Sequence, residues 1–171
     1  GTAVHRLLET LDLGRELGAQ VDERRDELTI ELERGLAPRE HAEAREHLER
    51  LLDRLQRGQL LQRLQDLAPH VVARELSLLL PPSGDDGPVG FLAGRVDLVY
   101  TDPGTGELVV ADYKTDAVGD GPELAARVDL YAPQVDLYAR GIREALGLDR
   151  RLRTELWFLA ADRVVVVPVA S

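Results

Sequence analysis

The chain contains 21 lysine and arginine residues, and only one of them, Lys114, is a lysine. Lys114 stands at the end of an apolar run and follows a carboxylate, in the sequence Asp112-Tyr113-Lys114-Thr115. An ammonium group is a compact charge whose pKa can fall, whereas a guanidinium is a rigid and permanently charged fork. An amine at this position therefore suits a catalytic site beside a bound metal ion and a phosphate.

A second carboxylate, Asp97, stands in another apolar run typical of a strand, residues 94–100. Asp112 and Lys114 are two residues apart, so on a strand their side chains project to one face while Tyr113 points to the other. Pairing of the two runs as a hairpin can bring Asp97 beside them. Two carboxylates held together repel by several kcal/mol, and a divalent cation between them relieves that repulsion. The pattern predicts a site for Mg²⁺ or Mn²⁺.

The elements that must position these residues begin near residue 70. Extended runs are predicted at 71–80, 89–100, 107–113, 152–160 and 163–169, with a helix from about 123 to 146 between the third and the fourth. Turn-forming residues 102–106 make a hairpin of the second and third runs, and 81–88 is a loop. Pro133 either breaks the helix or starts its main segment. The order βββαββ predicts an α/β fold with a mixed central sheet flanked by helices.

Residues 1–69 are rich in Leu, Glu, Arg and Gln with apolar positions at helical spacing. We expect three or four helices in this N-terminal helical appendage, with Pro38 in the first turn of a helix that ends near Arg57. Gly18, Gly35 and Gly58 separate the helices. The apolar stripe is clearest at Leu48, Leu51, Leu52 and Leu55. We expect a single domain over residues 1–171, comprising the helical appendage 1–69 and an α/β core 70–171.

Composition excludes several classes of protein. With no cysteine in the chain, disulfides, thiolate metal sites and cysteine nucleophiles are excluded. No apolar run approaches the length of a membrane span, and residues 1–5 lack the charged start and apolar core of a signal peptide, so we expect a soluble, intracellular protein without a membrane partner. A net charge of −10 argues against broad adhesion to nucleic acid, although bound cations would allow a local phosphate site. Because methionine is absent even at position 1, we expect the chain to be a piece of a longer polypeptide.

Four motifs in this order resemble the PD-(D/E)XK nuclease superfamily, and its RecB/AddA-type branch in particular. They are Gly1-Thr2-Ala3-Val4-His5, Gly94-Arg95-Val96-Asp97, Asp112-Tyr113-Lys114-Thr115 and Gln134-Val135-Asp136-Leu137-Tyr138. The resemblance spans nearly the whole chain, although residues 18–68 contribute little to it. It implies a restriction-endonuclease-like core.

The resemblance also implies roles for single residues. His5, Asp97 and Asp112, together with the backbone carbonyl of Tyr113, would ligate Mg²⁺ or Mn²⁺. The catalytic set would be Asp97, Asp112 and Lys114, with the lysine orienting or deprotonating the attacking water.

The motif in the later helix implies contacts with DNA. Gln134 and Tyr138 are one helical turn apart and Tyr131 lies three residues before Gln134, so the three share a face. An amide can bind phosphate there, and a phenol can bind or stack.

By this resemblance the chain is a metal-dependent deoxyribonuclease domain, of the exonuclease kind, that processes DNA ends in recombinational repair. Its partners would be DNA, as single strands or ends, and a helicase motor of the UvrD/RecB family in the same polypeptide or complex. The motor lies outside this chain because its lone lysine leaves no phosphate-binding Gly-x-x-x-x-Gly-Lys loop. The expected location is the cytoplasm, at a bacterial-type nucleoid.

Alternatives stay open for the same residues. The pair Asp112 and Lys114 could be a structural ion pair, and Glu75 is as well explained by an edge-strand salt bridge, so it is not counted among the ligands. Arg95 and Thr115 could touch phosphate, but support of the local sheet is the simpler interpretation. The whole chain could be a catalytically inactive nuclease-fold module that docks DNA ends or protein, or an all-helical adaptor.

Overall fold

The computed structural model describes residues 2–80 and 92–168. Its strands are β1 (Val71–Leu80), β2 (Leu92–Thr101), β3 (Leu108–Lys114), β4 (Arg153–Phe158) and β5 (Arg163–Val166). They form one sheet in the order β1-β2-β3-β4-β5. Three neighbouring pairs are antiparallel and β3–β4 is parallel, which confirms the predicted mixed sheet. The predicted loop 81–88 and the first residues of the run 89–100 lie outside the described residues.

Five α-helices precede the sheet in residues 2–80, which is more than the three or four predicted. They are α1 (Thr2–Thr10), α2 (Leu17–Glu23), α3 (Arg25–Arg34), α4 (His41–Arg57) and α5 (Leu60–Leu67). Gly35 and Gly58 cap α3 and α4 as expected, but Gly18 lies in the first turn of α2. Pro38 opens a 3-10 turn that leads into α4. The extra helix arises because the chain turns at Arg24 without a glycine, so α2 and α3 follow each other directly.

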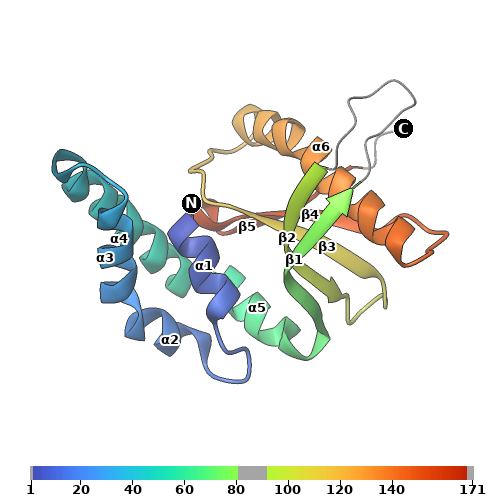
Figure 1. Ribbon diagram of the computed structural model, residues 1–171, viewed down its shortest axis with the longest axis horizontal. Helices are drawn as coiled ribbons and strands as arrows, with labels where there is room; N and C mark the ends of the chain where they lie inside the picture. Colours follow the sequence, from blue (N-terminus) through green and yellow to red (C-terminus); the bar gives the residue numbers. More distant parts are fainter. Residues whose placement is uncertain (1, 81–91, 169–171) are drawn as a thin grey trace.

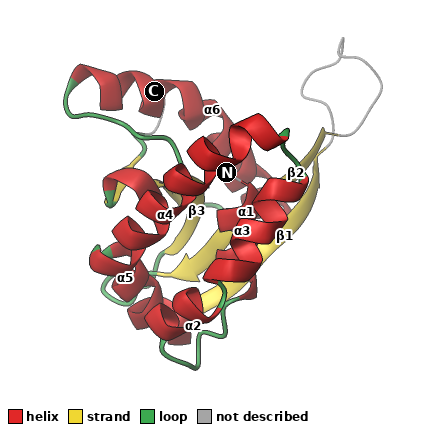
Figure 2. Ribbon diagram, turned by 90° about the vertical axis from the view of Figure 1, so that its left-hand side faces the viewer, coloured by secondary structure: helices red, strands yellow, loops and turns green. Residues whose placement is uncertain are grey.

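The N-terminal helices pack on one face of the sheet, and Figure 1 shows them gathered on one side with α6 (Pro122–Ala145) on the other. The predicted leucine stripe of α4 is buried, at Leu48, Leu51, Leu52 and Leu55. It shares a core with sheet residues such as Leu98, Tyr113 and Trp157. Each buried leucine stabilises the fold by about 1.5–3 kcal/mol. This packing fixes α1 against the sheet, as Figure 2 shows from the side.

Helix α6 covers the opposite face and connects β3 to β4. Val128, Val135 and Ile142 on α6 pack against sheet residues that include Val110 and Leu156. Alternate residues of β3 therefore face different cores, because side chains along a strand alternate between its faces. Val110 faces α6, whereas Tyr113 faces the N-terminal helices.

Pro133 lies inside α6, so the prediction that it breaks the helix or starts the main segment was wrong. The proline in the first turn of α6 is Pro122. Backbone N–H groups in the first turn of a helix have no acceptor within the helix, so the N–H that proline lacks is not missed there. Pro133 removes one hydrogen bond from the interior, but it is exposed, and the residues that α6 buries on either side hold the helix continuous.

The last strands are shorter than predicted. After β4 the chain forms a 3-10 turn at Leu159–Ala161, and β5 ends at Val166. Asp162 takes a left-handed conformation in the β4–β5 connection, and its carboxylate accepts hydrogen bonds from the N–H groups of Gln59 and Leu60 at the start of α5. None of the described helices has the length and apolarity needed to cross a bilayer.

Candidate metal centre

The centre lies where β2 separates from β3. The two strands pair from Leu98 opposite Ala111 to Thr101 opposite Leu108, whereas β1 and β2 stay paired as far as Leu80 and Leu92. Asp97 is the first residue of β2 beyond its pairing with β3. Its Oδ2 accepts a hydrogen bond of 2.5 Å from the backbone N–H of Tyr113. The carboxylate thus occupies the gap between the separating strands.

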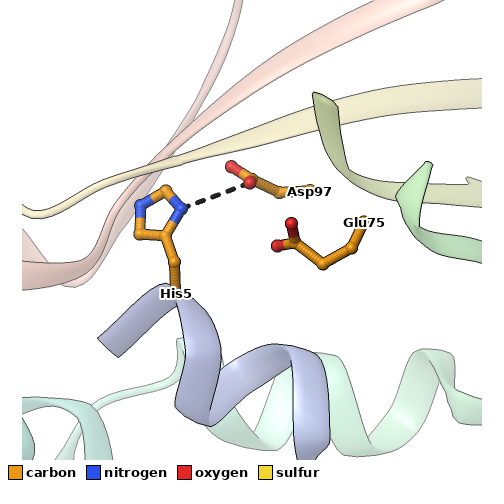
Figure 3. A group of neighbouring side chains, drawn as sticks. All are labelled: His5, Glu75 and Asp97. Atoms are coloured by element: carbon orange, nitrogen blue, oxygen red, sulfur yellow. Dashed lines mark hydrogen bonds and ion pairs between the residues drawn. The ribbon is translucent and has the colours of Figure 1, made fainter. Parts of the chain in front are cut away.

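Helix α1 brings His5 to this gap. Val4, Leu7 and Leu8 are buried under the sheet, which turns the next face of the helix, with His5, toward β2. His5 Nδ1 lies 3.2 Å from Asp97 Oδ1, and its ring meets the Tyr113 ring edge-on at 6.0 Å. Figure 3 shows the imidazole pointing at the Asp97 carboxylate.

Glu75 completes this group, although the sequence reasoning left it out. His5, Glu75 and Asp97 each offer a ligand atom, and these atoms lie within 4.8 Å of one another (Figure 3). Glu75 has φ +50°, a left-handed conformation that is rare for a residue with a side chain. A glutamate in a predicted strand was the one sequence feature that pointed to Glu75. Its left-handed backbone conformation could not be predicted from the sequence. Its salt bridge to Arg95, at 3.5 Å, is also present.

Asp112 and Lys114 share one face of β3 and Tyr113 takes the other, as the alternation predicted, and the shared face is the one toward α6. Lys114 Nζ is 2.6 Å from Asp112 Oδ2, but this ion pair lacks hydrogen-bond angles, and Oδ2 accepts no hydrogen bond from the described residues. The Asp112 side chain is only 5% exposed. Burial disfavours the charge of this carboxylate, and the ammonium offsets only part of that cost.

Burial and the charge of Asp97 raise the pKa values of Asp112 and Glu75. Burial is the largest cause of the raised pKa of Asp112, the charge of Asp97 adds to it, and Lys114 opposes both. Burial likewise raises the pKa of Glu75, with Asp97 again adding. For His5, burial alone would lower the pKa, but the hydrogen bond and charge of Asp97 outweigh it and raise the value. Crowded carboxylates beside an imidazole are the donors that Mg²⁺ or Mn²⁺ binds, so the residues fit such an ion.

Helix α6 holds the lysine from the other side. Lys114 Nζ donates to Gln134 Oε1 at 2.9 Å, and Gln134 Nε2 donates to the Tyr138 hydroxyl at 2.9 Å. The ammonium also lies 4.1 Å from the centre of the Tyr131 ring, whose hydroxyl donates to Asp116 at 2.7 Å. The chain of contacts fixes the amine next to Asp112.

These residues line one open cleft of about 920 Å³, to which α1, β1, β2, β3 and α6 all contribute. It includes His5, Glu75, Asp97, Asp112, Lys114, Gln134 and Tyr138. Of the residues singled out from the sequence, Tyr113 lies behind the cleft with its ring in the core, and Tyr131 reaches it through Lys114. Roles in metal or DNA binding remain predictions for all of them.

A mixed sheet between two helical layers, with an acid on one strand and Asp-x-Lys on the next, is the restriction-endonuclease-like α/β fold. The family comparison agrees: a model described as the PD-(D/E)XK nuclease superfamily matches residues 1–169, so the chain belongs to this superfamily. It is also similar to an ATP-dependent helicase/nuclease subunit of Desulforudis audaxviator (strain MP104C), with 42% identity over 69 residues. Those residues are 40% of this chain and 5% of that relative, so the chain matches only a small portion of it.

Proposed function

We propose that this chain is a divalent-metal-dependent deoxyribonuclease domain that hydrolyses DNA phosphodiester bonds. The observation that carries the proposal is the convergence of Asp97, Asp112 and Lys114, with His5 beside them, in one cleft of a superfamily of nucleases. A structural ion pair with Lys114 would need only Asp112. A bound cation also accounts for the presence of Asp97 and the His5 imidazole.

His5, Asp97 and Asp112 would hold Mg²⁺ or Mn²⁺ together with the backbone carbonyl of Tyr113, and Glu75 is positioned to add a further oxygen. A bound cation of this kind lowers the pKa of water and offsets charge on a phosphate. The hydrogen bond from the Tyr113 N–H to Asp97 sets the orientation of that carboxylate before any ion arrives. The ligands come from separate elements, α1, β1, β2 and β3, so the fold itself assembles the set.

Lys114 would orient the attacking water and offset the charge that develops on the phosphoryl oxygens. Its side chain is 13% exposed, so the ammonium acts where little water screens it. Asp112, Gln134 and the Tyr131 ring hold the amine from three directions. The amine is therefore positioned before substrate binds, which lowers the entropy cost of reaching the reactive arrangement.

Gln134, Tyr138 and Tyr131 would bind the DNA near the cleaved bond. Gln134 is exposed, and both polar ends of its amide are engaged, one by Lys114 and one by Tyr138. A phosphate entering the cleft would replace the Tyr138 hydroxyl as the acceptor of the Gln134 N–H, because an amide N–H and a phenol O–H both donate to phosphate oxygens.

The name of the relative, which describes a helicase/nuclease, supports a proposal for the biological setting. We infer that this domain works beside a helicase motor, in the same polypeptide or complex, as an exonuclease on DNA ends in recombinational repair in a bacterial cytoplasm. The net charge of −10 supports this, since an acidic domain holds DNA poorly by itself and benefits from a motor that delivers the strand.

Cleavage of labelled single-stranded DNA tests the proposal, with Mg²⁺ or Mn²⁺ against a chelator. We expect cleavage only with metal, and its loss in Asp112→Ala and Lys114→Ala. Arg50→Ala, on the surface of α4, is the control and should cleave normally. Tight metal binding without cleavage would mean that the motor is needed. The absence of both cleavage and metal binding would refute the nuclease and favour the docking module.

A further inference from the structure

Beyond the metal centre, β1 and β2 continue as a two-stranded arm. We define the arm as Ser77–Leu80 of β1 and Leu92–Arg95 of β2, which pair with each other but not with β3. Figure 2 shows the two strands running past the helices. Residues 77–79 and 93–95 all line the same open cleft as the metal centre. One wall of the cleft is therefore built by a segment that the proposed chemistry has not used.

The side chains of the arm form a ladder that starts at the metal centre. Ser77 pairs with Arg95, and Leu79 pairs with Ala93. Alternate residues of a strand share a face, so these two pairs follow Glu75 and Asp97 on one face of the arm. Successive pairs are about 6.8 Å apart, since two residues of a strand rise by about that distance. This spacing is comparable to that of neighbouring phosphates in an extended single strand.

The first step of the ladder suits a phosphate. The Arg95 side chain is 61% exposed and has one weak ion pair, with Glu75 at 3.5 Å. A guanidinium presents a planar fork of donors that matches phosphate oxygens, and Ser77 offers a hydroxyl beside it. Should Glu75 turn toward a cation, Arg95 would lose its carboxylate partner and need another anion.

The second step suits a base. Leu79 is 73% exposed and Ala93, its partner across the strands, is exposed as well. Exposed apolar side chains in a cleft that must admit a phosphate chain need an apolar surface to cover them. The bases of a single strand provide such a surface, whereas the bases of a duplex are stacked and paired inside it.

We propose that this face of the β1–β2 arm guides a single DNA strand away from the metal centre. Arg95 and Ser77 bind the phosphate next to the cleaved bond, and Leu79 with Ala93 contacts the base beyond it. The proposal rests on the proposed function, because it takes the metal centre as the place where the strand begins.

Salt dependence of binding tests the phosphate contact. Fluorescence anisotropy follows an oligothymidylate bound to the cleavage-deficient Lys114→Gln chain with Mn²⁺, over a series of salt concentrations. Each phosphate contact in a single strand contributes about 0.7 to the slope of log affinity against log salt. Arg95→Ala should lower the slope by about that amount and weaken binding about fivefold at low salt. Arg95→Lys should restore most of the slope.

Arg50→Ala is the matched control, because Arg50 is 64% exposed and also pairs with one glutamate, Glu46. An unchanged slope in Arg95→Ala, or the same change in Arg50→Ala, would overturn the proposal, as would failure of the parent chain to bind at any salt concentration. Cleavage plays no part in these measurements. If the salt slope changes as proposed but the unsubstituted chain never cleaves DNA, only the nuclease function is refuted. If the unsubstituted chain cleaves DNA but Arg95→Ala leaves the slope unchanged, only the strand-guiding role of the arm is refuted.

Oligonucleotides with one abasic position test the base contact. Leu79→Ala should weaken binding of the intact oligonucleotide about threefold, while Ile30→Ala, an exposed apolar residue on α3, should leave it unchanged. When the base that contacts Leu79 is removed, the parent chain should bind more weakly. Leu79→Ala should bind that abasic oligonucleotide as well as the intact one, because this variant already lacks the side chain that contacts the base. Equal losses in both chains at every position would overturn the contact.

Discussion

Two clusters of buried acids in this molecule differ in how their charges are matched. Glu155 on β4 is 1% exposed and faces the N-terminal helices, whereas Asp97 and Asp112 lie where β2 and β3 separate. Burial costs a carboxylate several kcal/mol unless hydrogen bonds and opposite charges compensate it. The partners around each acid therefore indicate whether it is complete within the protein.

Glu155 is complete. Its Oε2 accepts hydrogen bonds from the Tyr100 hydroxyl at 2.8 Å and from Trp157 Nε1 at 2.9 Å. Its Oε1 accepts from Arg153 at 2.7 Å and lies 3.5 Å from Arg63. Two guanidinium groups and two neutral donors surround the Glu155 carboxylate, and one of the guanidinium groups, Arg153, also pairs with Asp102 at 2.8 Å. Both oxygens of the Glu155 carboxylate therefore have donors, and this acid serves the fold, while Nε of Arg63 and Nε of Arg153 are buried without a hydrogen-bond partner among the described residues.

The metal centre is incomplete. Asp97, Asp112 and Glu75 lie beside one partly buried ammonium, from Lys114, an imidazole that is charged only when protonated, and the exposed guanidinium of Arg95, which is 3.5 Å from Glu75. One buried oxygen of Asp112 pairs with the Lys114 ammonium at 2.6 Å without hydrogen-bond geometry, and burial and Asp97 still raise the pKa of Asp112. A carboxylate surrounded by donors stabilises the fold, whereas carboxylates crowded by other acids are suited to a cation, as we propose for this centre.

Substitution of Lys114 should give the largest effect, on activity and not on stability. Lys114→Gln keeps the length of the side chain and removes the charge that would act on water and phosphate. We expect cleavage to fall roughly a thousandfold, which corresponds to about 4 kcal/mol of transition-state stabilisation. Single-turnover assays measure it, and urea unfolding should show a change below about 1 kcal/mol. Cleavage within tenfold of the parent chain would argue against the role of the amine.

Substitution of Glu155 should lower the stability of the fold and leave metal binding unchanged. Glu155→Gln leaves Arg63 without a carboxylate and Arg153 with Asp102 alone, among the residues that the structure describes, so we expect the free energy of unfolding to fall by about 2–4 kcal/mol. Urea unfolding measures this, and calorimetry should show that Mn²⁺ affinity is unchanged. A loss below about 0.5 kcal/mol would mean that the cluster does not hold the fold together.

Substitution of Gly94 should lower both the cleavage activity and the stability, each by less than the substitutions above. A Cβ at this position would lie 2.5 Å from Cε1 of Tyr138, so Gly94→Ala must displace that ring. The displacement would pass through Gln134 to Lys114, and we expect cleavage to fall about tenfold and stability by about 1–2 kcal/mol. Kinetics and urea unfolding of Gly94→Ala measure both. Full activity would show that the hydrogen-bonded chain does not position the amine.

Asp112 should give the smallest effect, on the metal-free protein. Because its pKa is raised in the folded state, the folded protein binds a proton more tightly than the unfolded chain does. Stability should therefore fall as pH rises from the unfolded carboxyl pKa of about 4 through the raised folded value. Asp112→Asn should remove this decline and make the metal-free protein slightly more stable above it. Urea unfolding across pH, with a chelator present, measures the difference, and an unchanged pH profile would contradict it.

Local patterns in the sequence predicted much of this site. The spacing of two between Asp112 and Lys114 predicted one shared face, because strands alternate regularly. The strand at 71–80 and the buried leucine stripe of α4 followed from the same kind of periodicity. His5 could be singled out only by its motif, since its neighbourhood with Asp97 depends on how α1 packs under the sheet.

Features that depend on tertiary packing were missed. The placement of Glu75 requires a left-handed residue inside a strand, which no local pattern indicates. Pro133 was expected to interrupt a helix that packing on the sheet keeps continuous. The Glu155 cluster joins β2, β4 and α5, so its residues are distant in sequence and carry no common spacing.

Titration calorimetry of Mn²⁺ into the metal-free chain, and into Asp97→Asn and Glu155→Gln, tests the central claim most directly. We predict binding to the parent chain and to Glu155→Gln with similar affinity, and loss of binding in Asp97→Asn. At a free concentration of about 100 times Kd, the ion should also raise the free energy of unfolding of the parent chain by about 2.7 kcal/mol. Equal binding by all three chains, or no binding by the parent chain, would contradict the claim that the acids between β2 and β3 are arranged for a cation.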